Sequence, residues 1–151
     1  MKSKLSVISI ALFTLFSCKK DDPITIQAKT PEELLTAKTW KLGEMRVVRS
    51  NSGTTDYYKR GGTSNTFNGD SDSARFNLNN TGIFYDFLGA TYTMTWNFTN
   101  SEKTRMIQVI NKPTPVTIML ENISLSDTYF GYSQYASDPI FYLASANRIP
   151  N

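Results

Sequence analysis

The clearest pattern in the chain is a strict alternation of apolar and polar residues between positions 91 and 99. Tyr92, Met94, Trp96 and Phe98 are separated by threonines and an asparagine. Because successive side chains of a β-strand point to opposite faces, this stretch predicts a strand with one buried and one solvated face. Related patterns predict further strands near residues 39–49, 57–58, 74–79, 83–88, 103–111, 116–120, 129–135 and 140–146.

Turn-forming residues separate these stretches about every ten residues, as at 79–82 and 112–115. A series of eight or nine short strands with this spacing is typical of antiparallel sandwiches and barrels. Strands do not alternate with long helical patterns, so a parallel sheet is not expected. The pattern alone leaves the choice between a sandwich and a barrel open.

A short helix is predicted just before the first strand. Thr30 can cap it, Pro31 suits the first helical position, and Glu33 completes a capping box. A Leu–Leu pair follows and supplies a small apolar face, and the helix should end near Lys38.

Two features interrupt the strand pattern. Gly43, inside the first strand, predicts a β-bulge. The polar stretch 61–72 predicts a long loop, and such loops are usually functional or mobile. From Asn68 onward its oxygen-bearing residues have the odd spacing of a calcium loop. However, the positions that need Gly and Glu hold Ser73 and Asn79, so we expect a solvated loop and no metal site.

The first 18 residues have the zones of a secretory signal. Lys2 and Lys4 precede an apolar run over 5–16, which is shorter than the roughly 20 residues of a membrane-spanning helix. The run ends in Leu-Phe-Ser-Cys, residues 15–18, which resembles a bacterial lipobox. The resemblance implies that Cys18 becomes the first residue of the mature chain and is acylated, with chains such as palmitate. The alternative is an uncleaved hydrophobic anchor with an incidental cysteine.

An acylated Cys18 would hold the protein on a lipid bilayer, because each buried methylene contributes about 0.8 kcal/mol. Residues 19–22, Lys-Lys-Asp-Asp, resemble an export signal for the cell surface, with a merely solvated linker as the alternative. We therefore expect a lipid-anchored protein of the outer membrane, on its periplasmic side or at the cell surface. The expected organisation is a signal peptide over 1–17, a lipidated tether over 18–29 and one domain over 30–151.

The domain is similar to the lipocalin-like lipoproteins of bacteria. The similarity rests on the capped helix leading into Ala-Lys-Thr-Trp-Lys-Leu at 37–42, on the hairpin at 76–82, and on Trp96 in a central strand. It implies an up-and-down antiparallel barrel of about eight strands with a short N-terminal helix. It also implies that Trp40 closes the bottom of the barrel, with Arg148 stacked on it as a structural cation–π pair.

Composition narrows the possible chemistry. The chain has no histidine and one cysteine, which excludes Ser–His and Cys–His catalysis, internal disulfides and multi-cysteine metal sites. No carboxylate pair has surroundings that would separate two pKa values. We expect no catalytic residue, no cofactor and no metal.

Net charge gives little support for nucleic-acid binding. The formal charge is +3, from 16 basic and 13 acidic residues. Without Lys2 and Lys4 the balance is 14 against 13, or +1. Basic residues do not cluster into a stripe, so nucleic acid is not an expected partner.

Three hypotheses for function remain, of which a carboxylate-based hydrolase is the least favoured. The apolar face of Tyr92, Met94, Trp96 and Phe98 either lines a ligand cavity or only packs in the core. In the first case the barrel binds a small hydrophobic or amphipathic ligand, as the resemblance implies, with the loop 61–72 as a lid. In the second it is a packed cell-surface module that contacts a protein or glycan through the long loop or through tyrosines expected to be exposed, Tyr57, Tyr58, Tyr132 and Tyr135. An interior of a few hundred Å³ would favour the ligand carrier, and the oligomeric state stays open.

Overall fold

The computed structural model describes residues 28–49, 53, 55–136 and 142–151. Within these residues one short helix precedes nine strands. The elements are α1 (Pro31–Thr36), β1 (Thr39–Arg49), β2 (Thr55–Lys59), β3 (Ser73–Phe76), β4 (Thr81–Tyr85), β5 (Thr91–Phe98), β6 (Met106–Ile110), β7 (Val116–Leu125), β8 (Phe130–Ala136) and β9 (Tyr142–Pro150).

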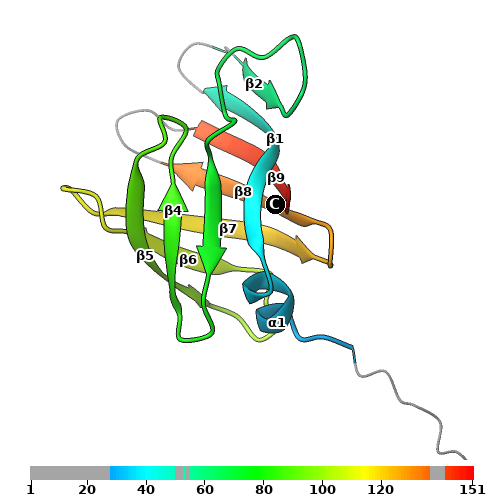
Figure 1. Ribbon diagram of the computed structural model, residues 1–151, viewed down its shortest axis with the longest axis vertical. Helices are drawn as coiled ribbons and strands as arrows, with labels where there is room; N and C mark the ends of the chain where they lie inside the picture. The colour runs from blue at the N-terminus through cyan, green and yellow to red at the C-terminus, as the bar shows by residue number, and fades with distance from the viewer. Residues whose placement is uncertain (1–27, 50–52, 54, 137–141) are drawn as a thin grey trace, which may run out of the picture.

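Eight of the strands form a closed antiparallel barrel (Figure 1). Each strand from β3 to β8 pairs with the next one in the sequence, and β9 pairs back with β1. Residues 39–41 of β1 and 73–75 of β3 complete the ring. The predicted fold class is therefore confirmed, and the pairing of β9 with β1 makes the sheet a barrel and not a sandwich.

β2 lies outside this ring, beside the upper half of β1 (Figure 1). Residues 44–48 of β1 pair with β2, whereas residues 39–41 pair with β3. β3 therefore lies beside the lower part of β1, and β2 with the loop that follows it lies beside the upper part. This arrangement makes the loop between β2 and β3 part of the barrel wall at the end farthest from α1.

The helix α1 lies against the other end of the barrel (Figure 1). The predicted capping box is present: Glu33 N donates to Thr30 Oγ1 at 3.2 Å, and Thr30 N donates to Glu33 Oε2 at 2.7 Å. Leu35 is fully buried, and its carbonyl accepts a hydrogen bond from Trp40 Nε1 at 2.8 Å. Helix and first strand are thus joined by packing and by a buried polar contact, and together they close this end.

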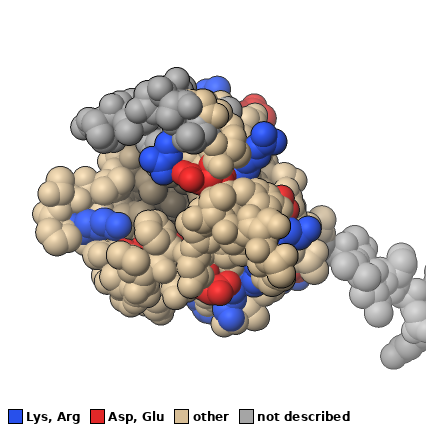
Figure 2. Space-filling model, turned by 90° about the horizontal axis from the view of Figure 1, so that it is seen from above, with Lys and Arg blue, Asp and Glu red and all other residues tan. Residues whose placement is uncertain are grey.

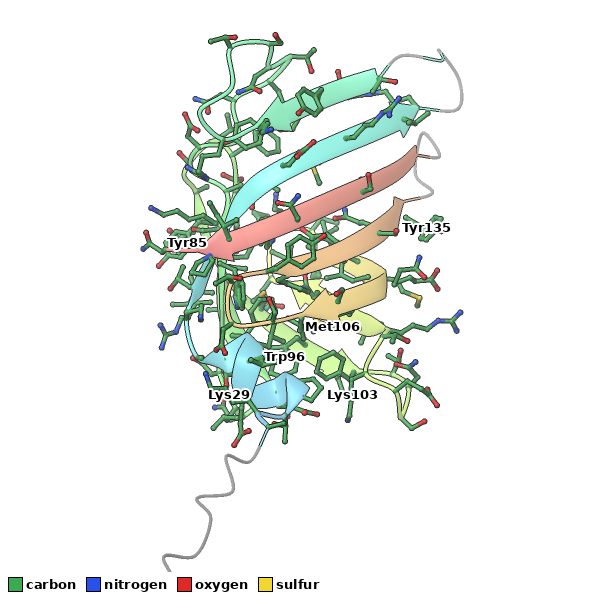
Figure 3. All side chains as sticks on the ribbon, turned by 90° about the vertical axis from the view of Figure 1, so that its right-hand side faces the viewer. Lys29, Tyr85, Trp96, Lys103, Met106 and Tyr135 are labelled. Carbon is green, nitrogen blue, oxygen red and sulfur yellow. The ribbon has the colours of Figure 1, made fainter. Side chains whose placement is uncertain are left out.

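The closed end is filled with aromatic rings. Trp40, Phe76, Trp96, Phe98 and Phe130 are all buried. Their centroids lie 5.7 to 5.9 Å apart in edge-to-face pairs, each of which contributes about 0.5–1.5 kcal/mol beyond area burial. Figure 3 shows Trp96 at this end, near α1.

The predicted bulge at Gly43 is present. Where β1 pairs with β9, the register shifts between Leu42 and Glu44. A Cβ at Gly43 would lie 2.6 Å from Oδ1 of Asn147, so the missing side chain allows the two strands to approach. The bulge keeps the inward face of β1 continuous, because Leu42 below it and Met45 above it both point into the barrel.

Candidate ligand-binding cavity

A cavity of about 540 Å³ occupies the end of the barrel opposite α1. Its walls come from the strand ends farthest from the helix, including Val47 of β1, Ile110 of β6 and Val116 of β7. Figure 2 looks at the molecule from this end and shows a hollow with acidic and basic side chains at its edge. Two small residues of β9, Ala144 and Ala146, are buried between Arg148 and this end, and small inward side chains leave room for a cavity.

Much of the cavity wall is apolar. Its apolar part comes from β1, β4, β6 and β7, from the loop between β2 and β3, and from the turn after β4. The apolar residues in the wall include Met45, Val47, Phe67, Phe84, Phe87, Ile110, Val116 and Ile118. A ligand that covers these side chains would remove apolar surface from water, which contributes about 25 cal/mol per Å².

A buried ion pair lies in the cavity wall, close to the packed end. Arg148 Nη2 of β9 lies 2.7 Å from Asp72 Oδ1, and the two side chains are 7% and 11% exposed. Arg148 also donates from Nε to the Tyr132 hydroxyl at 3.0 Å and from Nη1 to the Trp40 carbonyl at 3.3 Å. Burial alone would lower the pKa of Arg148, but Asp72 and Tyr132 outweigh it and raise that pKa above its ordinary value.

Two more ion pairs lie nearer the mouth. Arg49 Nη2 contacts Asp56 Oδ2 at 2.7 Å, and Lys112 Nζ lies 3.7 Å from Asp86 Oδ2. Asp86 is buried and accepts backbone hydrogen bonds from Leu88 at 3.0 Å and from Ala90 at 2.9 Å. This carboxylate therefore holds the turn between β4 and β5 in addition to pairing with Lys112.

Two uncharged polar side chains are also buried in the cavity wall. Gln108 of β6 and Tyr132 of β8 are 7% and 6% exposed. Tyr132 and the fully buried Tyr58 are therefore not the expected exposed tyrosines, because both point inward from their strands. Gln108 Nε2 donates to the sulfur of Met106 at 3.5 Å, a weak acceptor. Burial raises the pKa of Tyr132, and the negative charge of Asp72 adds to that rise while Arg148 opposes it, so the phenol keeps its proton at neutral pH.

The loop between β2 and β3 is held against the barrel by several contacts. Arg60 Nε donates to the Leu42 carbonyl at 2.8 Å, and the Tyr58 hydroxyl donates to Asp70 Oδ1 at 2.7 Å. Phe67 packs on Tyr58 with centroids 5.6 Å apart and lines the cavity. The expected lid therefore forms a side wall of the cavity, because Arg60 and Tyr58 tie it to β1 and β2.

The four residues singled out from the alternating pattern lie elsewhere in the barrel. Met94, Trp96 and Phe98 are buried in the core cluster, and Tyr92 packs against it half-buried. Trp96 Nε1 donates to the Thr81 carbonyl at 3.0 Å, so its polar atom is satisfied within the sheet. None of the four is among the described residues that line the cavity.

The arrangement of Trp40 and Arg148 differs from the expected stacked pair. Trp40 does lie buried at the closed end, but the cation over its ring is Lys38, whose Nζ is 5.6 Å from the ring centroid. The Arg148 guanidinium instead lies 5.9 Å from the Tyr132 ring centroid and is paired with Asp72. Arg148 thus joins the backbone of Trp40 to the cavity wall, because it points into the barrel from β9.

Two polar cavity residues, Gln108 and Arg148, can be recognised from the alternating pattern of their strands. Gln108 is the polar member of an apolar inward series with Met106 and Ile110, and Arg148 continues the inward series of Ala144 and Ala146. A polar residue in an apolar period-two series marks a polar group in the interior. Asp72 has no such signal, because it comes from a loop whose position depends on the packing of β2.

Among the described residues, no three histidine, cysteine, aspartate or glutamate side chains are grouped so as to hold a metal ion. The described part of the chain likewise contains no helix with the length and hydropathy needed to cross a bilayer. The predicted signal peptide, the acylation at Cys18 and most of the predicted tether lie outside the described residues.

The structure defines a class of protein: a closed eight-stranded antiparallel barrel with a cavity at one end, a fold consistent with a lipocalin-like ligand-binding domain. Comparisons of the chain with protein-family models, with curated proteins and with solved structures found no match.

Proposed function

We propose that this chain is a lipocalin-like lipoprotein whose barrel binds a small hydrophobic or amphipathic ligand without catalysis. The cavity of about 540 Å³ carries this proposal. Ligand pockets usually enclose about 300–1,000 Å³, with mainly apolar walls and a few placed polar groups. A barrel that acted only through its outer surface would need no such interior volume.

The cavity composition supports an amphipathic ligand. At roughly 30 Å³ for each water-sized group, 540 Å³ holds about 18 such groups. Apolar wall residues such as Phe84 and Ile118 would contact the apolar body of the ligand. The buried polar side chains of the wall would contact its polar end. The carboxylates in the wall support a non-catalytic role, because each is paired with a lysine or arginine.

Anchoring through Cys18 remains part of the proposal. The described domain begins next to α1, at the closed end of the barrel (Figure 1). A tether attached there would leave the cavity mouth at the end of the domain away from its attachment point. We propose a lipid bilayer as the partner, with the protein on the outer membrane, at its periplasmic side or at the cell surface.

Ligand binding can be tested by native mass spectrometry of the protein purified from its own host. We expect a co-purified small molecule in the wild type and its loss in Val47→Trp, because Val47 lines the cavity. The control is Val48→Trp, one residue further along β1, where the side chain is 42% exposed. A wild type without bound molecule, or a bound molecule that persists in Val47→Trp, would contradict the proposal.

Anchoring can be tested separately with Cys18→Ala. We expect the wild type to incorporate labelled palmitate and to sediment with membranes, and the variant to do neither. A Ser17→Ala variant keeps the cysteine and a small residue before it, so it should behave as the wild type does. A Cys18→Ala protein that stays with the membranes would contradict the lipid anchor without bearing on the cavity.

A further inference from the structure

We propose that the group of the ligand that reaches into the cavity is uncharged and both accepts and donates hydrogen bonds, as a hydroxyl or carboxamide does. Gln108 and Tyr132 would bind this group. The inference rests on the proposed ligand-binding function and narrows it to neutral amphipathic molecules.

The charged side chains of the cavity wall already neutralise one another. Three are acidic and three are basic, and each lies within 4 Å of its opposite. The pairs are Arg148 with Asp72 at 2.7 Å, Arg49 with Asp56 at 2.7 Å and Lys112 with Asp86 at 3.7 Å. An ionic ligand would therefore meet no uncompensated charge among the described residues, and it would have to separate one of these pairs.

Separation is hardest at the pair closest to the packed end. The Arg148 and Asp72 side chains are almost excluded from water, and Arg148 has further acceptors in Tyr132 and the Trp40 carbonyl. Removing one partner of a buried ion pair leaves an uncompensated charge in a medium that solvates it poorly. An anion that competed for Arg148 would leave Asp72 in that position, so this arginine is a poor carboxylate receptor.

Gln108 has hydrogen-bonding capacity to spare. A glutamine amide offers two donors and a carbonyl acceptor. Among the described residues, the one hydrogen bond of the Gln108 side chain is the weak one from Nε2 to the Met106 sulfur at 3.5 Å. A buried amide without matching partners costs free energy. Because Gln108 lines the cavity, its carbonyl and second N–H are available to a bound molecule.

Tyr132 adds a donor on the other side of β7. Its hydroxyl oxygen accepts from Arg148 Nε at 3.0 Å, which leaves the hydroxyl hydrogen to donate. The described hydrogen bond of this hydroxyl is the one that it accepts from Arg148, and Tyr132 lines the same cavity. A ligand group with one accepting oxygen and one donating hydrogen complements these two side chains without disturbing any ion pair.

The discriminating experiment compares three probes that share an eight-carbon chain: 1-octanol, octanoate and octylammonium. Their dissociation constants for the full chain are measured by isothermal titration calorimetry at neutral pH. We expect 1-octanol to bind at least roughly tenfold more tightly than either ion, because the ions lose hydration without gaining a partner. Tighter binding of either ion would overturn this inference while leaving the ligand-binding function intact, and no binding of any probe would overturn both.

Variants test the two residues directly. Gln108→Leu and Tyr132→Phe should each weaken 1-octanol binding, by roughly tenfold for the glutamine, and should leave the weak binding of the ions unchanged. The control is Thr117→Val, which removes a hydroxyl from the outer face of β7 and should change nothing. Unaltered 1-octanol binding in Gln108→Leu, as when water alone satisfies the amide, would overturn the assignment. Circular dichroism of each variant confirms that the barrel has formed.

Discussion

The ion pair between Arg148 and Asp72 allows a sharp test of how the barrel tolerates charge in its interior. Asp72→Asn keeps the size of the side chain and removes its charge. Arg148 would keep its hydrogen bonds to Tyr132 and to the Trp40 carbonyl, but its positive charge would lose its nearest counter-charge. Since the Arg148 side chain is 7% exposed, water replaces little of its interaction with the carboxylate.

The size of the effect follows from the geometry. At 2.7 Å, and with an effective dielectric constant of about 20, two unit charges attract by about 6 kcal/mol. Desolvation offsets part of this attraction, and breaking one side of a buried pair typically costs 3–5 kcal/mol. We therefore expect Asp72→Asn to lower the free energy of unfolding by about 3–5 kcal/mol.

Urea unfolding followed by far-ultraviolet circular dichroism measures this loss. Asp56→Asn is the matched control, because its partner Arg49 is 47% exposed and exposed pairs contribute about 0–1 kcal/mol. The double variant Asp72→Asn with Arg148→Met should recover part of the lost stability, since no buried charge is left unpaired. Equal losses for Asp72→Asn and Asp56→Asn, or purely additive losses in the double variant, would refute this reasoning.

Three further predictions concern the folded barrel, and each is checked by urea unfolding. Phe130→Ala should cost about 3–5 kcal/mol, because Phe130 is fully buried against the rings of the closed end; a loss below 1 kcal/mol would contradict that packing. Gly82→Ala should cost about 1–3 kcal/mol, because the new Cβ would lie 2.4 Å from the Arg75 carbonyl, and an unchanged midpoint would show that the strands can separate. Burial, reinforced by the hydrogen bond to Asp70, raises the pKa of Tyr58 to about 12. Its folded pKa then exceeds the unfolded value of about 10, so it contributes stability below pH 10 that is lost as the pH rises through 12. Tyr58→Phe should lose less stability over that interval, and an equal loss would count against the shift.

The apolar face of β5 shows how far a pattern can predict a site. Alternation correctly indicated that Met94, Trp96 and Phe98 are buried. It carries no information on the position of a residue along the barrel axis. Trp96 and Phe98 lie toward the closed end, where rings from neighbouring strands fill the interior. A strand pattern shows which face is inward, whereas the volume opposite that face depends on the side chains of the other strands.

Asp72 and Arg148 show the complementary limit. They are 76 residues apart in the sequence and 2.7 Å apart in the barrel. The two residues become neighbours because both flanking strands pair with β1: β9 on one side, and β3, which begins just after Asp72, on the other. The loop before β3 also supplies Phe67 to the cavity wall. These neighbours depend on ring closure, which one strand pattern at a time does not reveal.

The sequence by itself determined the antiparallel β class, the capped helix, the bulge at Gly43 and the inward face of most strands. These features follow from local rules of side-chain alternation, capping and backbone freedom. Only the tertiary structure decided that the sheet closes, that one end is packed and the other hollow, and that the interior charges are paired. Those properties depend on which distant side chains meet across the barrel, and that is set by strand register and by the summed volume of the inward residues.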